Sequence, residues 1–425
     1  MLKTLQNAFK VKDVRHRIFY VLMMLVVIRI GSQLPVPGVD GSYFKTWFES
    51  QTGDAFNFLD AFTGGSFSQM SIFALSITPY ITSSIIIQLL TIAIPKLEEM
   101  QRDGEDGRKK LGAITRYVTI GLSLFESIAM AIGFGNRGLI PDNNFVKIIV
   151  VVVALTAGSA FLMWVGEQIN EKGVGNGISI VLLINIVSRI PSDMTTLYES
   201  FMKGKIIAKA LLSGVIIAAI IIGVVILVII LNGAERRIPV QYSRKMVGRK
   251  MMGGQSTNIP LKVNTAGVIP IIFASCIIYF PAQLAAIFNV DWLTTFANWC
   301  STGWLNWLLT VALIVFFAYF YTSMVFNPEE TADNLRKQGG FIPGVRPGTA
   351  TVQYIKNVIN RVTLPGGIFI ALIAVVPTII FYFTNNQLIQ AFGGTSILIM
   401  IGVALDTMSK VESQLKMYNY EGFFK

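Results

Sequence analysis

Residues 56–94, FNFLDAFTGGSFSQMSIFALSITPYITSSIIIQLLTIAI, decide the fold of this chain. The first part, Phe56–Phe67, is rich in Phe but makes only about three helical turns, far short of the roughly 20 residues that cross a bilayer. The second part, Ile72–Ile94, is long enough to cross, and it carries Pro79 and several hydroxyl groups. We expect a short helix that dips into a membrane, followed by a helix that lines a cavity, because irregular backbone at membrane depth needs protein or water partners. A surface amphipathic helix followed by a kinked span is the alternative.

The composition is that of a polytopic membrane protein. Hydrophobic residues make up 53% of the 425 residues and charged residues only 14%. One His and two Cys, Cys276 and Cys300, provide neither a His/Cys metal site nor a disulfide framework. We therefore expect no metal and no cofactor. The first apolar run, Ile18–Leu34, lacks a small-x-small cleavage signal and contains Arg29, so it is predicted to be a retained span.

Apolar runs predict an all-α membrane protein with ten transmembrane helices. Most of the 35 Lys and Arg residues lie in or next to the terminal segments and alternate connections, which places both termini in the cytoplasm. The predicted spans are Ile18–Leu34, Ile72–Ile94, Leu111–Phe134, Val146–Val165, Gly177–Ile190, Ile206–Leu231, Thr265–Phe288, Trp304–Phe326, Val358–Phe383 and Thr395–Met408.

The two halves of the chain look related. Spans two and seven each have a proline, Pro79 or Pro270, followed by small polar residues and paired isoleucines. Spans five and ten are both short and follow glycines. Such spans at matching places predict two pseudo-symmetric, inverted five-helix halves, residues 1–190 and 191–425, around a central pathway. Chance similarity between Ile- and Ser-rich helices is the alternative.

Charged residues within the spans are few. Arg29 and Asp406 lie close enough to span ends to reach water by snorkelling. Glu126 lies in the middle of a span and has no evident partner in the sequence. Ion-coupled transporters usually carry buried charges as ion or proton sites. The hydroxyl and aliphatic character of the predicted pathway argues against such a site.

Two connections, 232–264 and 327–357, are large and basic. The first has seven Lys or Arg residues against one acidic residue, and alternating residues around Arg237–Ser243 indicate a strand. The Pro and Gly residues of GGFIPGVRPG indicate defined turns in the second. The two connections are predicted to form a cytoplasmic docking platform for a large partner. Anionic lipid or RNA could also bind such a surface, or the charges could serve only to fix topology.

Eight motifs occur in order along nearly the whole chain. They are PVPG at 35–38, SIFALSITPYI at 71–81, GEQINEKGVGNGIS at 166–179, RRIPVQY from 236, QSTNIPLKVNTAGVIPIIFAS at 255–275, VFNPEETADNL at 325–335, GFIPGVRPG at 340–348 and FGGTS at 392–396. On these motifs the chain resembles the bacterial SecY family, the channel subunits of the Sec protein translocase (SecYEG).

The resemblance implies an hourglass pore between the two halves, with an aliphatic ring at its waist. Leu182 departs from the isoleucine that is usual there, but it keeps the volume and polarity. The pairs 77/81 and 178/182 have i, i+4 spacing, which independently places each pair on one helix face. The ring implied by the motif positions is Ile77, Ile81, Ile178, Leu182, Ile272 and Ile399.

Other parts of the channel follow from the same resemblance. The half-helix 56–67 resembles the family's plug, which closes the external side of the ring, with Phe56, Phe58, Leu59, Phe62, Gly64, Gly65 and Phe67. Spans two and seven resemble the lateral gate, with Ser83, Ser84, Gln88, Asn264 and Phe280. Gln88 and Asn264 are expected to be polar partners across the closed gate. The implied docking residues are Arg236, Arg237, Arg244, Lys245, Arg249, Lys250 and Arg346.

The implied function is passage of unfolded secretory polypeptides across the bacterial inner membrane, and lateral release of membrane segments into lipid. The expected partners are the small subunits SecE and SecG, the SecA ATPase or the ribosome, signal peptides and lipid. No Walker A, HExxH or nucleophile-elbow motif is present, so the chain is expected not to be an enzyme. A secondary transporter with five-plus-five inverted repeats and an essential Glu126 is the main alternative. An intramembrane protease is disfavoured because no catalytic pair occurs within the spans.

Overall fold

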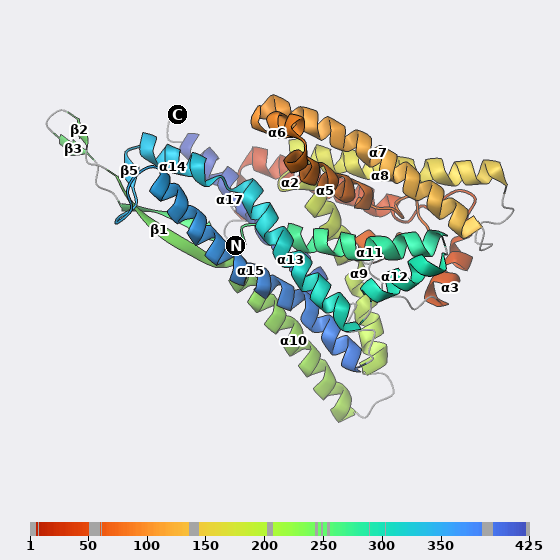
Figure 1. Ribbon diagram of the computed structural model, residues 1–425. Helices are drawn as coiled ribbons and strands as arrows, with labels where there is room; N and C mark the ends of the chain where they lie inside the picture. Colours follow the sequence, from red (N-terminus) through yellow and green to blue (C-terminus); the bar gives the residue numbers. More distant parts are fainter. Residues whose placement is uncertain are drawn as a thin grey trace.

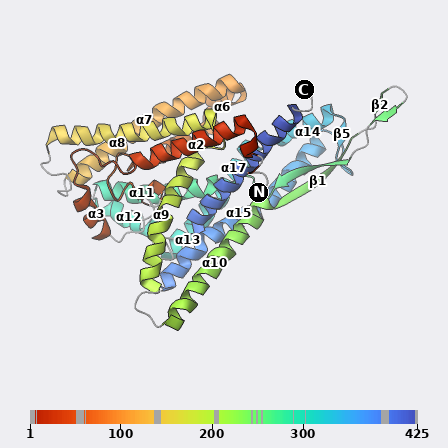
Figure 2. The same ribbon diagram turned by 180° about the vertical axis from the view of Figure 1, so that it is seen from behind.

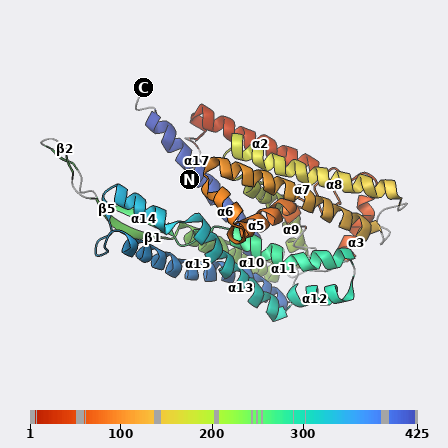
Figure 3. The ribbon, with the colours of Figure 1, turned by 45° about the horizontal axis from the view of Figure 1, so that its top comes forward.

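The computed structural model describes most of the chain. The described residues are 6, 8–50, 60, 62–135, 144–201, 207–242, 245–247, 250–252, 256–288, 290–301, 303–384 and 394–421. The helices make one elongated bundle, and a small sheet lies at one end (Figure 1). The helices α3 and α12 lie at the opposite end (Figures 1 and 3).

Helices from the first part of the sequence lie together. The long helices α7 and α8 run side by side, and α2 packs along α8 (Figure 2). The helix α5 packs on α7 and bends by 107° into α6, at the break before Pro95. The helices are α2 (Lys12–Gly31), α3 (Gly41–Ser50), α5 (Thr78–Ala93), α6 (Pro95–Arg102), α7 (Glu105–Gly135), α8 (Phe145–Lys172) and α9 (Gly177–Phe201).

Helices from the second part form a neighbouring group. The helix α13 packs against both α11 and α15, and α17 reaches back to contact α9 and α2. The helix α11 also contacts α5 and α7, so it joins the two groups. The helices are α10 (Ile207–Gly233), α11 (Ile269–Phe288), α12 (Asp291–Ser301), α13 (Gly303–Val325), α14 (Pro328–Lys337), α15 (Thr349–Thr384) and α17 (Gly394–Glu421).

Each of the ten predicted spans overlaps a helix. Within the described residues, α7, α8, α13 with α14, and α15 are long and apolar enough to cross a membrane, and the bent pair of α5 and α6 adds a fifth candidate. The helices α9 and α17 continue well past the predicted span ends Ile190 and Met408, because polar residues follow the apolar part on the same helix. The apolar part of α9, Gly177–Ser192, is nevertheless close to the predicted short span Gly177–Ile190.

The start of α5 also differs from its prediction. The helix begins at Thr78 rather than at Ile72, and residues 72–77 form turns. Pro79 stands in the first helical turn, where its missing N–H leaves no hydrogen bond unmade. Pro79 therefore starts the helix and does not kink a longer one.

The basic connections build a small sheet, which a purely helical description omits. The predicted strand around Arg237 is confirmed as β1 (Glu235–Tyr242), which pairs antiparallel with β4 (Ser256–Lys262) and β5 (Gly340–Phe341). A separate hairpin joins β2 (Lys245–Val247) and β3 (Lys250–Met252). Because β1 pairs with strands from both connections, the two connections form one unit. Its buried side chains are Ile238, Val240, Leu261, Ala332, Leu335, Ile342 and Ile355.

An apolar cluster ties the beginning of the described chain to its end. We call it the terminal clasp. Arg17 Nη1 also donates to the carbonyl oxygen of Gly173 beside it, over 3.4 Å. The clasp consists of Ala8, Val14, Val174, Val411 and Leu415.

Candidate functional site

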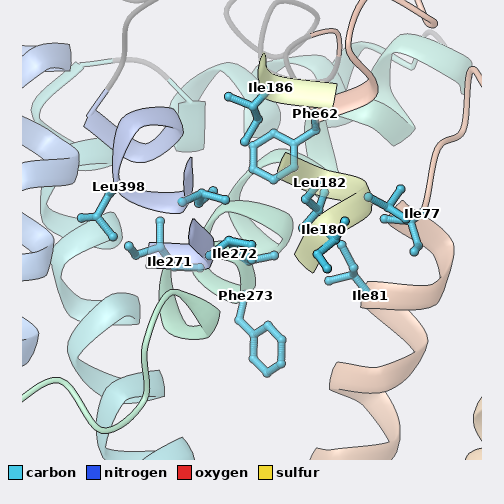
Figure 4. Close-up of a cluster of buried hydrophobic side chains, with 14 of the residues drawn as sticks. Phe62, Ile77, Ile81, Ile180, Leu182, Ile186, Ile271, Ile272, Phe273 and Leu398 are labelled. Carbon is cyan, nitrogen blue, oxygen red and sulfur yellow. The ribbon is translucent and has the colours of Figure 1, made fainter. Parts of the chain in front are cut away.

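A large buried apolar cluster lies where the two groups of helices meet. It takes residues from α2, the segment before α5, α5, α8 and α9, and from α10, α11, α13, α15 and α17. Figure 4 shows Ile81, Leu182 and Ile272 among the side chains that fill it. Five of the six predicted ring residues are buried members of this cluster and Ile178 packs against it, while the ring itself stays a prediction. Ile77 and Ile399 have no exposed surface at all.

The segment before α5 enters this cluster through Phe62. Its side chain is buried and belongs to the cluster together with Leu182 and Ile186 of α9 (Figure 4). Phe62 and Thr63 are helical, and turns follow from Gly64 to Met70. The predicted half-helix therefore ends earlier than Phe67. Phe56, Phe58 and Leu59 lie outside the described residues.

Gly64 and Gly65 both adopt backbone angles that favour glycine. Their φ values are +66° and +84°. At Gly64 a Cβ atom would also lie 2.8 Å from the Cα and carbonyl oxygen of Asn185. A side chain at position 64 would push the segment away from α9, so glycine allows the close approach.

Phe67 packs in a different place from Phe62. It is buried in a second apolar cluster, and its ring makes edge contacts with Phe44 at 6.0 Å and Phe134 at 6.4 Å. The predicted plug residues therefore divide between two sites. Phe62 faces the central cluster, and Phe67 fixes the following turn against α3 and α7.

The comparisons with known proteins agree with this architecture. The SecY family model matches residues 71–408. The chain is 42% identical to the protein translocase subunit SecY of Halalkalibacterium halodurans over 100% of both chains, and 42% identical to that of Corynebacterium glutamicum over 99% of both. The chain belongs to the SecY family. It is a protein-conducting channel and not an enzyme, which disfavours the secondary-transporter alternative.

Solved structures show the same fold at low sequence identity. A protein-conducting channel superposes with a TM-score of 0.63 at 17% identity, covering 93% of this chain and 91% of that one. Sec61 in a canine ribosome-channel complex gives a TM-score of 0.59 at 16% identity, with the same coverage.

The predicted gate residues of this SecY-family protein lie on and near α5 and α11, which touch. Ser83 is fully buried and donates to the carbonyl oxygen of Pro79 over 2.7 Å. Gln88 Nε2 donates to Ser84 Oγ over 3.0 Å, and the side-chain oxygen Oε1 of Gln88 is buried without a hydrogen-bond partner among the described residues.

Asn264 makes a different bond from the one expected. It donates to Asn232 Oδ1 over 2.8 Å, and in the described part of the chain it makes no bond to Gln88. The expected Gln88–Asn264 pair is therefore not formed in this conformation. Phe280 is 37% exposed on α11.

Glu126 of the SecY-family protein lies on α7, which packs against α11. Among the described residues, no cation lies within ion-pair distance of it, and no group of three His, Cys, Asp or Glu side chains could hold a metal ion. The arrangement lacks the paired charges of an ion-coupling site.

The predicted docking residues fall on the sheet unit. Arg236, Arg237 and Arg346 are exposed, and Arg237 forms an ion pair with Glu235 at 2.6 Å. The strands β2 and β3 contain Lys245 and Lys250, whose side chains lie outside the description. Arg244 and Arg249 lie outside the described residues altogether.

Three polar residues at the central cluster were not among the predicted site residues. They are Asp60, Asn185 and Arg189, and they connect the segment before α5 to α9. Asn185 stands within an apolar run and Arg189 at the end of one, which is the only signal in the sequence. Their partners could not be inferred, because the connected positions are more than 100 residues apart.

Proposed function

We propose that unfolded secretory polypeptides pass through the centre of this channel, at a ring made by Ile77, Ile81, Ile178, Leu182, Ile272 and Ile399. The single observation that carries the proposal is that five of these side chains, from both halves of the chain, belong to one buried apolar cluster and the sixth, Ile178, packs against it. Branched aliphatic side chains offer no specific hydrogen bonds to a passing chain. When the pore is empty they disfavour a continuous water column.

The membrane arrangement has ten spans in two inverted halves, residues 1–190 and 191–425, with both termini in the cytoplasm of a bacterial cell and the spans in its inner membrane. Two observations support it. A helix overlaps each predicted span, and the Lys and Arg residues favour one side. The basic sheet unit lies at one end of the bundle, and α3 and α12 lie at the other (Figure 3).

The segment around Phe62 acts as the plug on the external side of the ring. Its support is the burial of Phe62 beside Leu182 and Ile186. The helices α5 and α11 act as the lateral gate, where signal peptides bind and membrane segments leave toward lipid. Their mutual contact supports this assignment, as does their membership of the central cluster.

The sheet unit and Arg346 bind the partner that drives transport, either the SecA ATPase or the ribosome. The support is that both basic connections join in one folded unit with exposed arginines. Two structures with the same fold are Sec61 in a ribosome-channel complex and a yeast Ssh1 complex bound to the 80S ribosome. The small subunits SecE and SecG pack around the two halves.

Crosslinking of an arrested substrate tests the pathway. In a background with Cys276 and Cys300 replaced by Ala, a cysteine at Leu182 or Ile272 should form a disulfide with a cysteine in a precursor halted during export. Val153 of α8 is 59% exposed on the outside of the bundle, so Val153→Cys is the matched control and should not react. Equal reaction at all three positions, or reaction at Val153 alone, would contradict the proposed pathway.

A further inference from the structure

A buried ion pair joins the proposed plug to α9. Asp60 Oδ2 lies 3.2 Å from Arg189 Nη1, and the two side chains are only 8% and 19% exposed. The other carboxylate oxygen, Oδ1, accepts the backbone N–H of Ser68 over 2.9 Å. One carboxylate oxygen of Asp60 therefore binds within its own segment, and the other pairs with Arg189 of α9.

Asn185 adds two hydrogen bonds one helical turn away from Arg189. It is 2% exposed, and its Nδ2 donates to the carbonyl oxygen of Phe62 over 3.0 Å and to Ser76 Oγ over 3.1 Å. The backbone of Ser76 has a φ of +53°, an unusual angle for a residue with a side chain. The bond from Asn185 thus holds Ser76 in a strained turn directly before α5.

These polar residues share a helix face with the proposed ring. Residues 178, 182, 185 and 189 follow the spacing i, i+4, i+7 and i+11, which lies along one side of α9. The same side of the helix that carries Ile178 and Leu182 therefore continues into Asn185 and Arg189. Any motion of the plug away from the ring must break the polar contacts on this face.

Further contacts converge on the carbonyl oxygen of Gly64. Arg29 Nη2 of α2 donates to it over 3.4 Å, and Ser188 Oγ of α9 over 3.5 Å. Both donors are at the long end of the hydrogen-bond range, so these contacts are weaker than those of Asn185 and Asp60. The plug is thereby held to two helices, with its strongest contacts on α9.

The entry of water into the pore would weaken the polar contacts between the proposed plug and α9. An ion pair in a dry interior is costly to separate, because each charge is left uncompensated. Once water fills the pore, both charges regain hydration and their attraction weakens. Such contacts hold firmly while the pore is dry and release readily once it is wet, which suits a threshold for opening.

We propose that Asp60, Asn185 and Arg189 form a latch that sets how strong a signal sequence must be to open the channel. The latch makes these residues determinants of substrate specificity, because it fixes the free energy that a substrate segment must supply to displace the plug. The inference rests on the proposed function of the plug.

A charge swap tests the latch. Asp60→Asn removes one charge at nearly constant shape, and Arg189→Gln removes the other charge with a shorter polar side chain. In proteoliposomes with the driving ATPase, each should raise export of a precursor with a charged residue in its signal core at least fivefold, and should raise the idle ion conductance. The double variant Asp60→Arg with Arg189→Asp restores opposite charges and should return both values toward those of the parent. Coupling of this kind separates a direct interaction from two independent effects.

The control is Asp406→Asn, which removes one carboxylate from an exposed ion pair with Lys410 on α17. It should leave export and idle conductance at parent values. Unchanged export and conductance in both single variants would overturn the latch proposal. The proposal would also fail if the effect of the double variant equals the sum of the effects of Asp60→Arg alone and Arg189→Asp alone. Thermal unfolding of each purified variant identifies any that fail to fold, and the near-isosteric variant Asp60→Asn then decides the question.

Deletion of residues 60–65 separates failure of the latch from failure of the plug. If the deletion variant conducts ions while the single variants do not, the latch proposal is refuted and the plug proposal stands. If the deletion variant stays closed like the parent, both the plug proposal and the latch proposal are refuted.

Discussion

The side-chain amide of Asn185 donates to the backbone oxygen of Phe62, 123 residues earlier in the chain, over 3.0 Å. The same amide nitrogen reaches Ser76 Oγ, just before α5 begins. One buried side chain on α9 therefore bonds both to the segment proposed as the plug and to the turn before α5, a helix of the proposed gate.

Replacing Asn185 by Ala should loosen the plug. The change leaves the Phe62 carbonyl and the Ser76 hydroxyl without their partner, which costs about 1–3 kcal/mol for buried polar groups. Hydrogen exchange measured by mass spectrometry should then be roughly tenfold faster over residues 62–76, since about 1.4 kcal/mol corresponds to a factor of ten. Asn306→Ala on α13 is the control and should leave this region unchanged. Equal exchange in parent and Asn185→Ala would show that the amide does not hold the segment.

Polar substitutions in the ring should weaken the seal. Asn at Ile81 or Ile399 supplies groups that would hold water at the proposed ring, which favours the open state. Single-channel recording should show more frequent opening of the idle protein, and precursors with defective signal sequences should be exported. Ile81→Leu and Ile399→Val keep the ring apolar and should behave like the parent. If a polar variant conducts fewer ions than the parent, the assignment of these residues to the ring is wrong.

Reversing the charge of Arg346 should disrupt docking of the driving partner. Arg346 is exposed next to the sheet unit, so Arg346→Glu should impair ATPase-driven export by about tenfold or more, a binding loss of about 1.4 kcal/mol. Insertion and thermal stability should stay at parent values. Lys109→Glu makes the same charge change on α7 and should leave export intact. Normal export by Arg346→Glu would exclude the residue from the docking surface.

Truncating the core of the sheet unit should unfold the docking surface alone. Leu335 is buried beneath β1 and β5, and Leu→Ala changes at such sites cost about 2–5 kcal/mol. Limited proteolysis should cut the connections 232–264 and 327–357 much faster in Leu335→Ala. Arg336→Ala, at an exposed neighbouring position, should not change the rate. Faster cleavage within α7 or α8 as well would mean that the unit is not independent of the bundle.

Hydropathy located the helices well, because long apolar runs have few other stable structures in a membrane. It placed their ends poorly. The helix α9 continues to Phe201 and α17 to Glu421, since helix formation does not stop where apolarity stops. The turns before α5 were also missed, because the local sequence reveals neither the positive φ of Ser76 nor its hydrogen bond to Asn185.

Some features of the candidate site could also be predicted from the sequence, and others could not. The six ring residues could be named from motifs, and the structure brings them into one cluster. The pairing of Asp60 with Arg189 could not be predicted, because neither residue stands in a motif and 129 positions separate them. The pairing of β1 with both β4 and β5 likewise needs the tertiary fold, which brings two separate connections together.

The terminal clasp bears on what happens when the backbone is cut between α9 and α10. Ala8 and Val14 near the start are packed against Val411 and Leu415 near the end, and Val174 completes the cluster. Non-covalent packing thus already bridges the two portions that the backbone joins between α9 and α10. Two polypeptides produced by a cut in that connection should therefore find each other and co-purify as one complex, and labels fused at the two ends should report on each other by energy transfer at short range.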